Sequence, residues 1–217
     1  MEKRYPFPLC IQLTPPLDYS EQKFLKILDL LKKLEIYGIE LNIIDFSEGK
    51  IEQLSEILKR FDLQLTMIAS GAYAKMYGMN LSSTDEVIRQ KGVDALAYML
   101  NRASRMNAGV ICGYMKGEAA GYRESAERQM IKSLSELDYM GVLQRAPLYL
   151  EATNHYEALL VNQVSEGVAF AKEVNGPLYV LPDTYHMNIE ERSIEAVLVK
   201  YANFYKNVHI SDNNRYF

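Results

Sequence analysis

The chain has 217 residues, of which 48% are hydrophobic and 24% charged, and its formal net charge is −4. These proportions are typical of a folded globular protein and disfavour a disordered chain. The acidic balance disfavours a nucleic-acid surface, which needs a basic patch. The first residues lack the apolar run of a secretion signal, and no stretch is long enough to span a bilayer. We therefore expect a cytoplasmic protein that binds neither membranes nor nucleic acids.

Seven short apolar runs predict β-strands. They lie at residues 10–13, 38–43, 63–68, 109–112, 148–151, 178–181 and 207–210. Cys10 and Cys112 fall within the first and fourth runs, and no framework of paired cysteines surrounds them. We expect both to be buried, reduced thiols without a catalytic role.

Stretches with helical periodicity separate the predicted strands. One helix is indicated by apolar residues that share a face at helical spacing, namely Ile51, Leu54, Leu58 and Phe61. Another begins at a capping box, with Ser83 as the N-cap and Glu86 three residues later, and runs toward Asn107. Glycines stand where helices would end before the next strand, at Gly38, Gly109, Gly141 and Gly176. Strand and helix therefore alternate through one domain, residues 1–217.

This alternation implies parallel strands with helical crossovers, in either an open doubly wound sheet or a closed (β/α)₈ barrel. The open sheet usually has a glycine-rich loop after its first strand, but here the strand runs into Leu13-Thr14-Pro15-Pro16. Polar residues also favour the barrel. Glu151, Asp183 and His209 stand at the C-terminal ends of the fifth, sixth and seventh predicted strands. In a barrel these ends meet at one mouth, where barrel enzymes hold their active sites.

Each of these three residues also has an ordinary structural explanation. Glu151 could be a surface charge or a helix cap, Asp183 could cap a turn, and His209 could be a histidine of the core. Together, however, two carboxylates and an imidazole suit a divalent ion such as Mn²⁺, Co²⁺, Mg²⁺ or Zn²⁺. We therefore predict that Glu151, Asp183 and His209 form a metal site.

Three motifs of the chain resemble those of the sugar isomerase and epimerase family, which includes the ketose 3-epimerases and other xylose-isomerase-like TIM barrels. The motifs are LEATNHYE at 150–157, LPDTYHMNIEE at 181–191 and HISDNNR at 209–215. The segments around residues 70–75 and 80–83 resemble the loop after the family's third strand and the helix that follows it. The resemblance covers the chain from Glu40 to its C-terminus.

The resemblance implies a role for each matched residue. Glu151, Asp183 and His209 would bind the metal, which would stabilise an enediolate, and Glu151 would also remove the proton from carbon as general base. The residues expected to bind the sugar are Glu157, His186 and Arg215. The family often stacks a tryptophan on the sugar. This chain has no tryptophan, so Tyr73 or Tyr77 could take that contact.

The family pattern continues beyond the seventh strand to an eighth, which carries another metal-binding glutamate, and that unit is absent from this chain. We therefore expect an incomplete barrel of seven strands that self-associates. Two hypotheses for its function remain: a metal-dependent isomerase or epimerase of a ketose, and a catalytically defective member that at most binds metal or sugar weakly. A DNA-repair endonuclease on a similar barrel is disfavoured, because it would need more histidines than His155, His186 and His209.

Overall fold

Six parallel strands form one sheet in which each strand pairs with its neighbours in the sequence. The computed structural model describes residues 6–117 and 120–213. The strands are β1 (Cys10–Leu13), β2 (Gly38–Leu41), β3 (Gln64–Ala69), β4 (Gly109–Cys112), β5 (Leu148–Glu151) and β6 (Leu178–Leu181). This order has none of the reversal that defines a doubly wound sheet, so the predicted barrel-type α/β fold is confirmed. The sheet is not closed, and β1 forms one of its edges.

The predicted seventh strand at 207–210 is wrong as a strand, because only one residue of it pairs with the sheet. Asp183 and His209 form an isolated parallel bridge, in which the His209 N–H donates to Pro182 O at 2.8 Å. Two residues before Pro182, on β6, the Val180 N–H donates to Phe204 O at 2.9 Å, and not to a residue of the predicted strand. Because Phe204 occupies that position, residues 205–208 are not in register for a continuous ladder.

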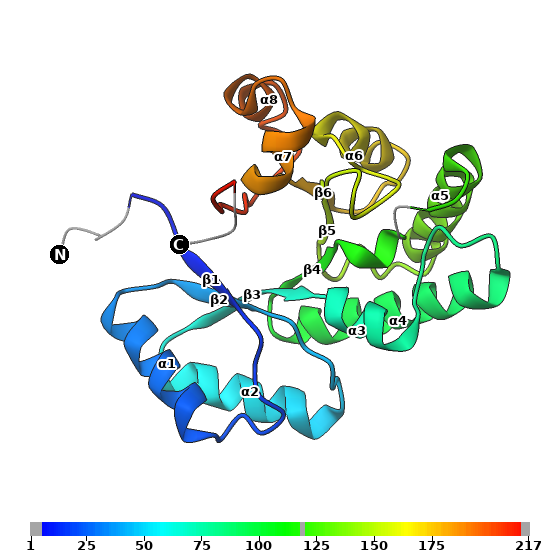
Figure 1. Cartoon of the computed structure of the whole chain (residues 1–217). Coiled ribbons are helices and arrows are strands. Elements are labelled where there is room, and N and C mark those ends of the chain that lie inside the picture. The colour runs from blue at the N-terminus through cyan, green and yellow to red at the C-terminus, as the bar shows by residue number, and fades with distance from the viewer. Residues whose placement is uncertain (1–5, 118–119, 214–217) are drawn as a thin grey trace.

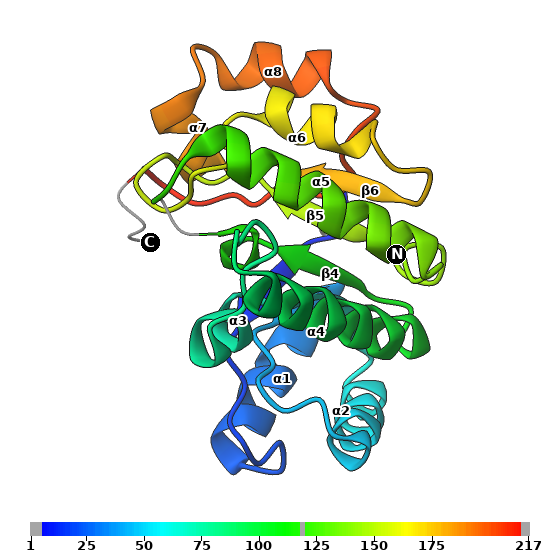
Figure 2. The ribbon, with the colours of Figure 1, turned by 90° about the vertical axis from the view of Figure 1, so that its right-hand side faces the viewer.

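Helices cover the outside of the curved sheet (Figure 1). Their bounds are α1 Gln22–Lys33, α2 Glu48–Arg60, α3 Gly71–Tyr77, α4 Glu86–Arg105, α5 Arg123–Tyr139, α6 Val164–Ala171, α7 Thr184–Glu190 and α8 Ile194–Lys200, with a short 3₁₀ turn, η1, at Tyr114–Lys116. Figure 2 shows α4, α5, α6 and α8 stacked along one side, outside the strands. Within the described residues, no helix combines the length and apolar character of a transmembrane segment.

The apolar face predicted for α2 is confirmed, since Ile51, Leu54 and Leu58 are all buried. The predicted cap of α4 is wrong. Asp85, not Ser83, is the N-cap, and its side chain accepts from the N–H groups of Val87 and Ile88. Ser83 instead accepts from the Asp85 N–H. The helix therefore begins two residues later than the capping-box pattern predicts, because an aspartate is an equally good cap nearer the apolar stretch.

Three turns that lead from helices into strands use residues other than glycine. Glu35, Asp62 and Asn107 adopt left-handed backbone conformations, with φ between 55° and 58°, so Gly38 and Gly109 do not end helices. Gly109 is needed for close packing instead, because a Cβ there would lie 2.4 Å from the Tyr149 ring. Gly141, with φ of 67°, does follow α5 as predicted.

The strands place their side chains alternately on two faces, and this alternation positions the candidate site. Leu148 and Leu150 pack in the large core between sheet and helices. A smaller cluster of Met67, Ala69, Ile111, Tyr149 and Leu181 packs separately. Since side chains along a strand alternate in direction, Glu151 lies on the same face as Tyr149, at the end of the strand.

Candidate metal centre

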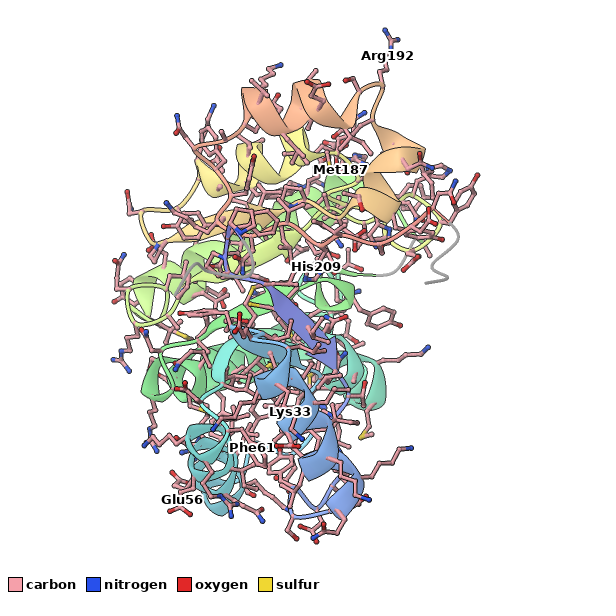
Figure 3. All side chains as sticks on the ribbon, turned by 90° about the vertical axis from the view of Figure 1, so that its left-hand side faces the viewer. Lys33, Glu56, Phe61, Met187, Arg192 and His209 are labelled. Carbon is pink, nitrogen blue, oxygen red and sulfur yellow. The ribbon has the colours of Figure 1, made fainter. Side chains whose placement is uncertain are left out.

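Glu151, Asp183 and His209 come together at the C-terminal ends of the strands. One potential ligand atom from each residue lies within 4.8 Å of the other two. His209 Nδ1 is 3.2 Å from Glu151 Oε1 and 3.7 Å from Asp183 Oδ2. Figure 3 shows His209 near the middle of the molecule, whereas Glu56 and Arg192 lie toward opposite ends. The structure therefore brings together all three residues that the sequence placed at strand ends.

Asp183 caps a helix with one carboxylate oxygen and approaches His209 with the other. Its Oδ1 caps α7 by accepting from the N–H groups of Tyr185 at 2.8 Å and His186 at 3.4 Å. Its Oδ2 is the oxygen nearer His209. The structural role of a cap thus leaves one carboxylate oxygen turned toward the candidate site.

Glu40 is a third acidic residue at this site and was not singled out from the sequence. It lies on β2, its Oε2 is 2.8 Å from His209 Nε2, and it is 5% exposed. The sequence could have indicated Glu40 as a candidate site residue, because it is a charged residue within the otherwise apolar run of β2. With Nε2–H donating to Glu40, the His209 ring is oriented so that Nδ1 faces Glu151 and Asp183, as in metal sites that orient a histidine through a carboxylate.

Three carboxylates around one imidazole dominate the electrostatics. Burial alone would lower the pKa of His209, but its hydrogen bonds to Asp183, Glu151 and Glu40 raise it to about 12. Burial would likewise raise the pKa values of Glu151 and Asp183, yet the hydrogen bond from His209 helps to lower both. The site therefore holds ionised carboxylates and, without a metal, a protonated His209.

The floor beneath Glu151 is formed by the loop after β4. A Cβ at Gly113 would come within 2.3 Å of Glu151 Oε2, so any other residue there would displace this carboxylate oxygen. The fully buried Lys116 donates from Nζ to Gly113 O at 3.0 Å and to Thr153 Oγ1 at 2.5 Å. The positive charge of Lys116 also contributes to lowering the pKa of Glu151.

The three converging groups fit a divalent ion. Ligand atoms that bind at about 2.0–2.3 Å are separated by no more than about 4.6 Å, close to the separations seen here. Two carboxylates and an imidazole are ligands for Mn²⁺, Co²⁺, Mg²⁺ or Zn²⁺ and do not select one of them.

A cavity of about 1080 Å³ lies over these groups. Phe7 and Tyr114 are the aromatic residues in its wall. Tyr73 and Tyr77, the residues expected to stack on a sugar, line a different hollow beside Phe46. That expectation is wrong, because α3 turns both rings toward the loop that follows β2.

Two of the residues expected to bind the sugar line this cavity. Glu157 and His186 both line it, and His186 lies within α7 and is 2% exposed. The buried Asn154 connects these two residues, since its Nδ2 is 2.8 Å from His186 Nδ1 and 3.3 Å from Glu157 Oε1. Arg215, the third residue expected to bind sugar, lies outside the described residues.

Neither cysteine contributes a reactive thiolate at neutral pH. Both are free; Cys112 is buried, whereas Cys10 is only partly buried. Burial raises the pKa of both thiols, that of Cys112 to about 12.

Comparison with known proteins gives consistent matches. A family model described as xylose isomerase-like TIM barrel matches residues 28–216. L-ribulose 3-epimerase of Methylomonas sp. is 25% identical over 182 residues, which are 82% of this chain and 62% of the relative. D-psicose 3-epimerase of Ruminiclostridium cellulolyticum is 28% identical over 177 residues, which are 78% and 59% of the two chains. The chain thus spans about three fifths of the length of these relatives.

Solved structures share the fold. The apo 3-keto-D-glucoside 4-epimerase YcjR of E. coli superposes with a TM-score of 0.78 at 19% identity, over 96% of this chain and 81% of that one. D-allulose 3-epimerase of Methylomonas sp., in complex with D-allulose, superposes with a TM-score of 0.76 at 21% identity, over 98% and 75% of the two chains.

Proposed function

Because the chain belongs to the xylose isomerase-like TIM barrel family, we propose that it acts as a metal-dependent epimerase or isomerase of a ketose. The observation that carries this proposal is the convergence of Glu151, Asp183 and His209 within 4.8 Å of one another. The ketose 3-epimerases among its relatives support a sugar as the substrate class.

We assign the removal of the proton from carbon to Glu151. Its Oε1 lies beside His209 and its Oε2 lies over Gly113, so one oxygen could bind the metal while the other reaches the substrate. A bound divalent ion supplies Lewis acidity toward the substrate oxygens. The ionised state of Glu151, which His209 and Lys116 favour, is the state that a general base requires.

Other residues of the cavity would orient the sugar. Glu157, His186 and Arg215 are proposed to bind its hydroxyl groups through hydrogen bonds, which are stronger where one partner is charged. No glycine-rich phosphate-binding loop follows the first strand, which favours a free sugar over a sugar phosphate. The names of the relatives suggest L-ribulose, D-psicose and D-tagatose as first substrates to test.

Exchange of the C3 hydrogen in D₂O tests this proposal directly. Glu151 acting as a base exchanges the C3 hydrogen for deuterium even if the proton returns to the same face. We therefore expect Mn²⁺- or Co²⁺-dependent deuterium incorporation into the ketose, followed by mass spectrometry or proton NMR. Glu151→Gln should lower the exchange rate by about 10²–10⁴, the usual contribution of a positioned general base.

Chromatography of the same samples separates the two functional hypotheses. Exchange with a new epimer indicates an epimerase, and exchange without a new epimer indicates that the proton returns only to its original face. If Mn²⁺ binds but no ketose exchanges its C3 hydrogen, the chain is the catalytically defective member and the proposal is wrong.

A further inference from the structure

Asn154 lies between the two described residues proposed to bind sugar, and its own orientation is determined by the backbone. The Tyr156 N–H is 3.0 Å from Asn154 Oδ1. Since a backbone N–H can only donate, this contact identifies the oxygen end of the amide. The amide nitrogen, Nδ2, therefore faces His186 and Glu157.

The orientation of Asn154 in turn determines where His186 carries its proton. Asn154 Nδ2 is 2.8 Å from His186 Nδ1, and the Asn154 backbone N–H donates to the same atom at 3.2 Å. Both groups are donors, so Nδ1 must be an acceptor without a proton. A neutral imidazole with unprotonated Nδ1 carries its proton on Nε2.

The second hydrogen of the Asn154 amide serves Glu157. Nδ2 lies 3.3 Å from Glu157 Oε1, so one buried amide contacts an acceptor on each of two residues that line the cavity. Asn154 is 1% exposed, and water cannot readily replace these contacts. Toward a ligand, His186 then has a proton to donate and Glu157 has carboxylate oxygens to accept.

We propose that Asn154 is a positioning residue that fixes His186 as the Nε2–H tautomer, so that His186 meets a ligand oxygen only as a hydrogen-bond donor. His186 then selects a hydroxyl or carbonyl oxygen that accepts its Nε2 proton. Glu157 selects a hydroxyl group that donates a hydrogen to its carboxylate. A ligand bearing an ammonium in place of that oxygen would bring a donor against Nε2–H and be rejected. This preference in sugar binding rests on the proposed function, whereas the tautomer itself does not.

Nitrogen-15 NMR of the imidazole groups tests the tautomer without any substrate. The sample is the uniformly labelled, EDTA-treated protein, and the His186 signals are identified by their loss in His186→Gln. We expect a protonated Nε2 and an unprotonated Nδ1. A proton on Nδ1 of the wild-type protein would overturn the proposal, and this measurement does not depend on any variant of Asn154 folding.

Asn154→Asp tests the role of the amide, because a carboxylate beside Nδ1 accepts where the amide donated. We expect Nδ1 to become protonated and kcat/KM for the ketose to fall by about 10- to 100-fold, the range found for partners that orient metal-binding histidines. Asn188→Asp is the matched control, since Asn188 is exposed on the same helix as His186, and it should change neither quantity.

Unchanged His186 signals in Asn154→Asp would show that the backbone N–H of residue 154 is sufficient, and would contradict the proposed role of the Asn154 side chain. If the wild-type protein shows the Nε2–H tautomer but exchanges hydrogen in no ketose, the proposed function fails while the assignment of Asn154 stands.

Discussion

His209 lies between the carboxylates of Glu40, Glu151 and Asp183, and this position links metal binding to pH. The raised pKa of about 12 means that both ring nitrogens carry protons at neutral pH when no metal is bound. A metal ion at Nδ1 must displace one of these protons. Because that proton is released over the whole neutral range, metal affinity rises with pH.

We expect the apparent affinity for Mn²⁺ to rise about tenfold per pH unit over roughly pH 6–8, as release of one proton requires. Calorimetry in two buffers that differ in ionisation enthalpy counts the protons released. Glu40→Gln should leave the number near one at neutral pH, because Asp183 and Glu151, whose hydrogen bonds raise the pKa of His209 more than the hydrogen bond to Glu40 does, remain. Binding that is independent of pH in the wild-type protein would show that His209 is not a ligand.

Arg89 holds two helices together at the element scale. It is fully buried on α4, and its guanidinium donates to Ser133 Oγ at 2.9 Å and to Glu136 Oε1 at 2.8 Å, both on α5. It also pairs with Glu86 within α4. Ser133 in turn donates to Leu81 O at 2.7 Å, so the network reaches the loop before α4.

Arg89→Met should lower the free energy of unfolding by about 1–3 kcal/mol, because the buried Ser133 loses a partner. Glu86→Gln is the control. The Glu86 side chain is 57% exposed although its partner Arg89 is buried, and a glutamine oxygen can still accept from the guanidinium, so loss of the Glu86 charge should lower stability by no more than about 1 kcal/mol. Urea unfolding measures both values. Equal stability of Arg89→Met and the wild-type protein would refute a stabilising role for this network.

The strands that could be predicted from the sequence are those that a local run of apolar residues specifies. Six apolar runs became strands, and five of them, all except the edge strand β1, contribute buried residues to the sheet. The seventh did not, since pairing of Val180 with Phe204 depends on a loop conformation that periodicity does not report. Glu40 was missed for a similar reason: it lies 169 residues from His209 in the sequence and meets it only through the curvature of the sheet.

In the part of the chain that the structure describes, the sheet leaves an unclosed gap, here called the seam, beside the candidate site. β1 is an edge of the sheet, and residues 7–12 and 206–211 are both among those that line the cavity over the candidate site. Phe7 and Ile210 in these stretches are 58% and 78% exposed. An unpaired strand edge next to exposed apolar side chains favours association with another chain.

We therefore expect the purified chain to self-associate, and sedimentation velocity across a range of protein concentrations measures this. The mean sedimentation coefficient should rise with concentration or correspond to a dimer or larger species throughout. A monomer at every concentration would show that the seam does not act as an interface.

The central claim is that one divalent ion binds between Glu151, Asp183 and His209. Anomalous diffraction from crystals of the wild-type protein soaked in Mn²⁺ tests it most directly. We predict a single strong anomalous peak about 2.0–2.3 Å from one atom of each residue, with Glu40 hydrogen-bonded to the far side of the His209 ring. A peak elsewhere in the cavity, or no peak at saturating Mn²⁺ with all three side chains ordered, would contradict the claim.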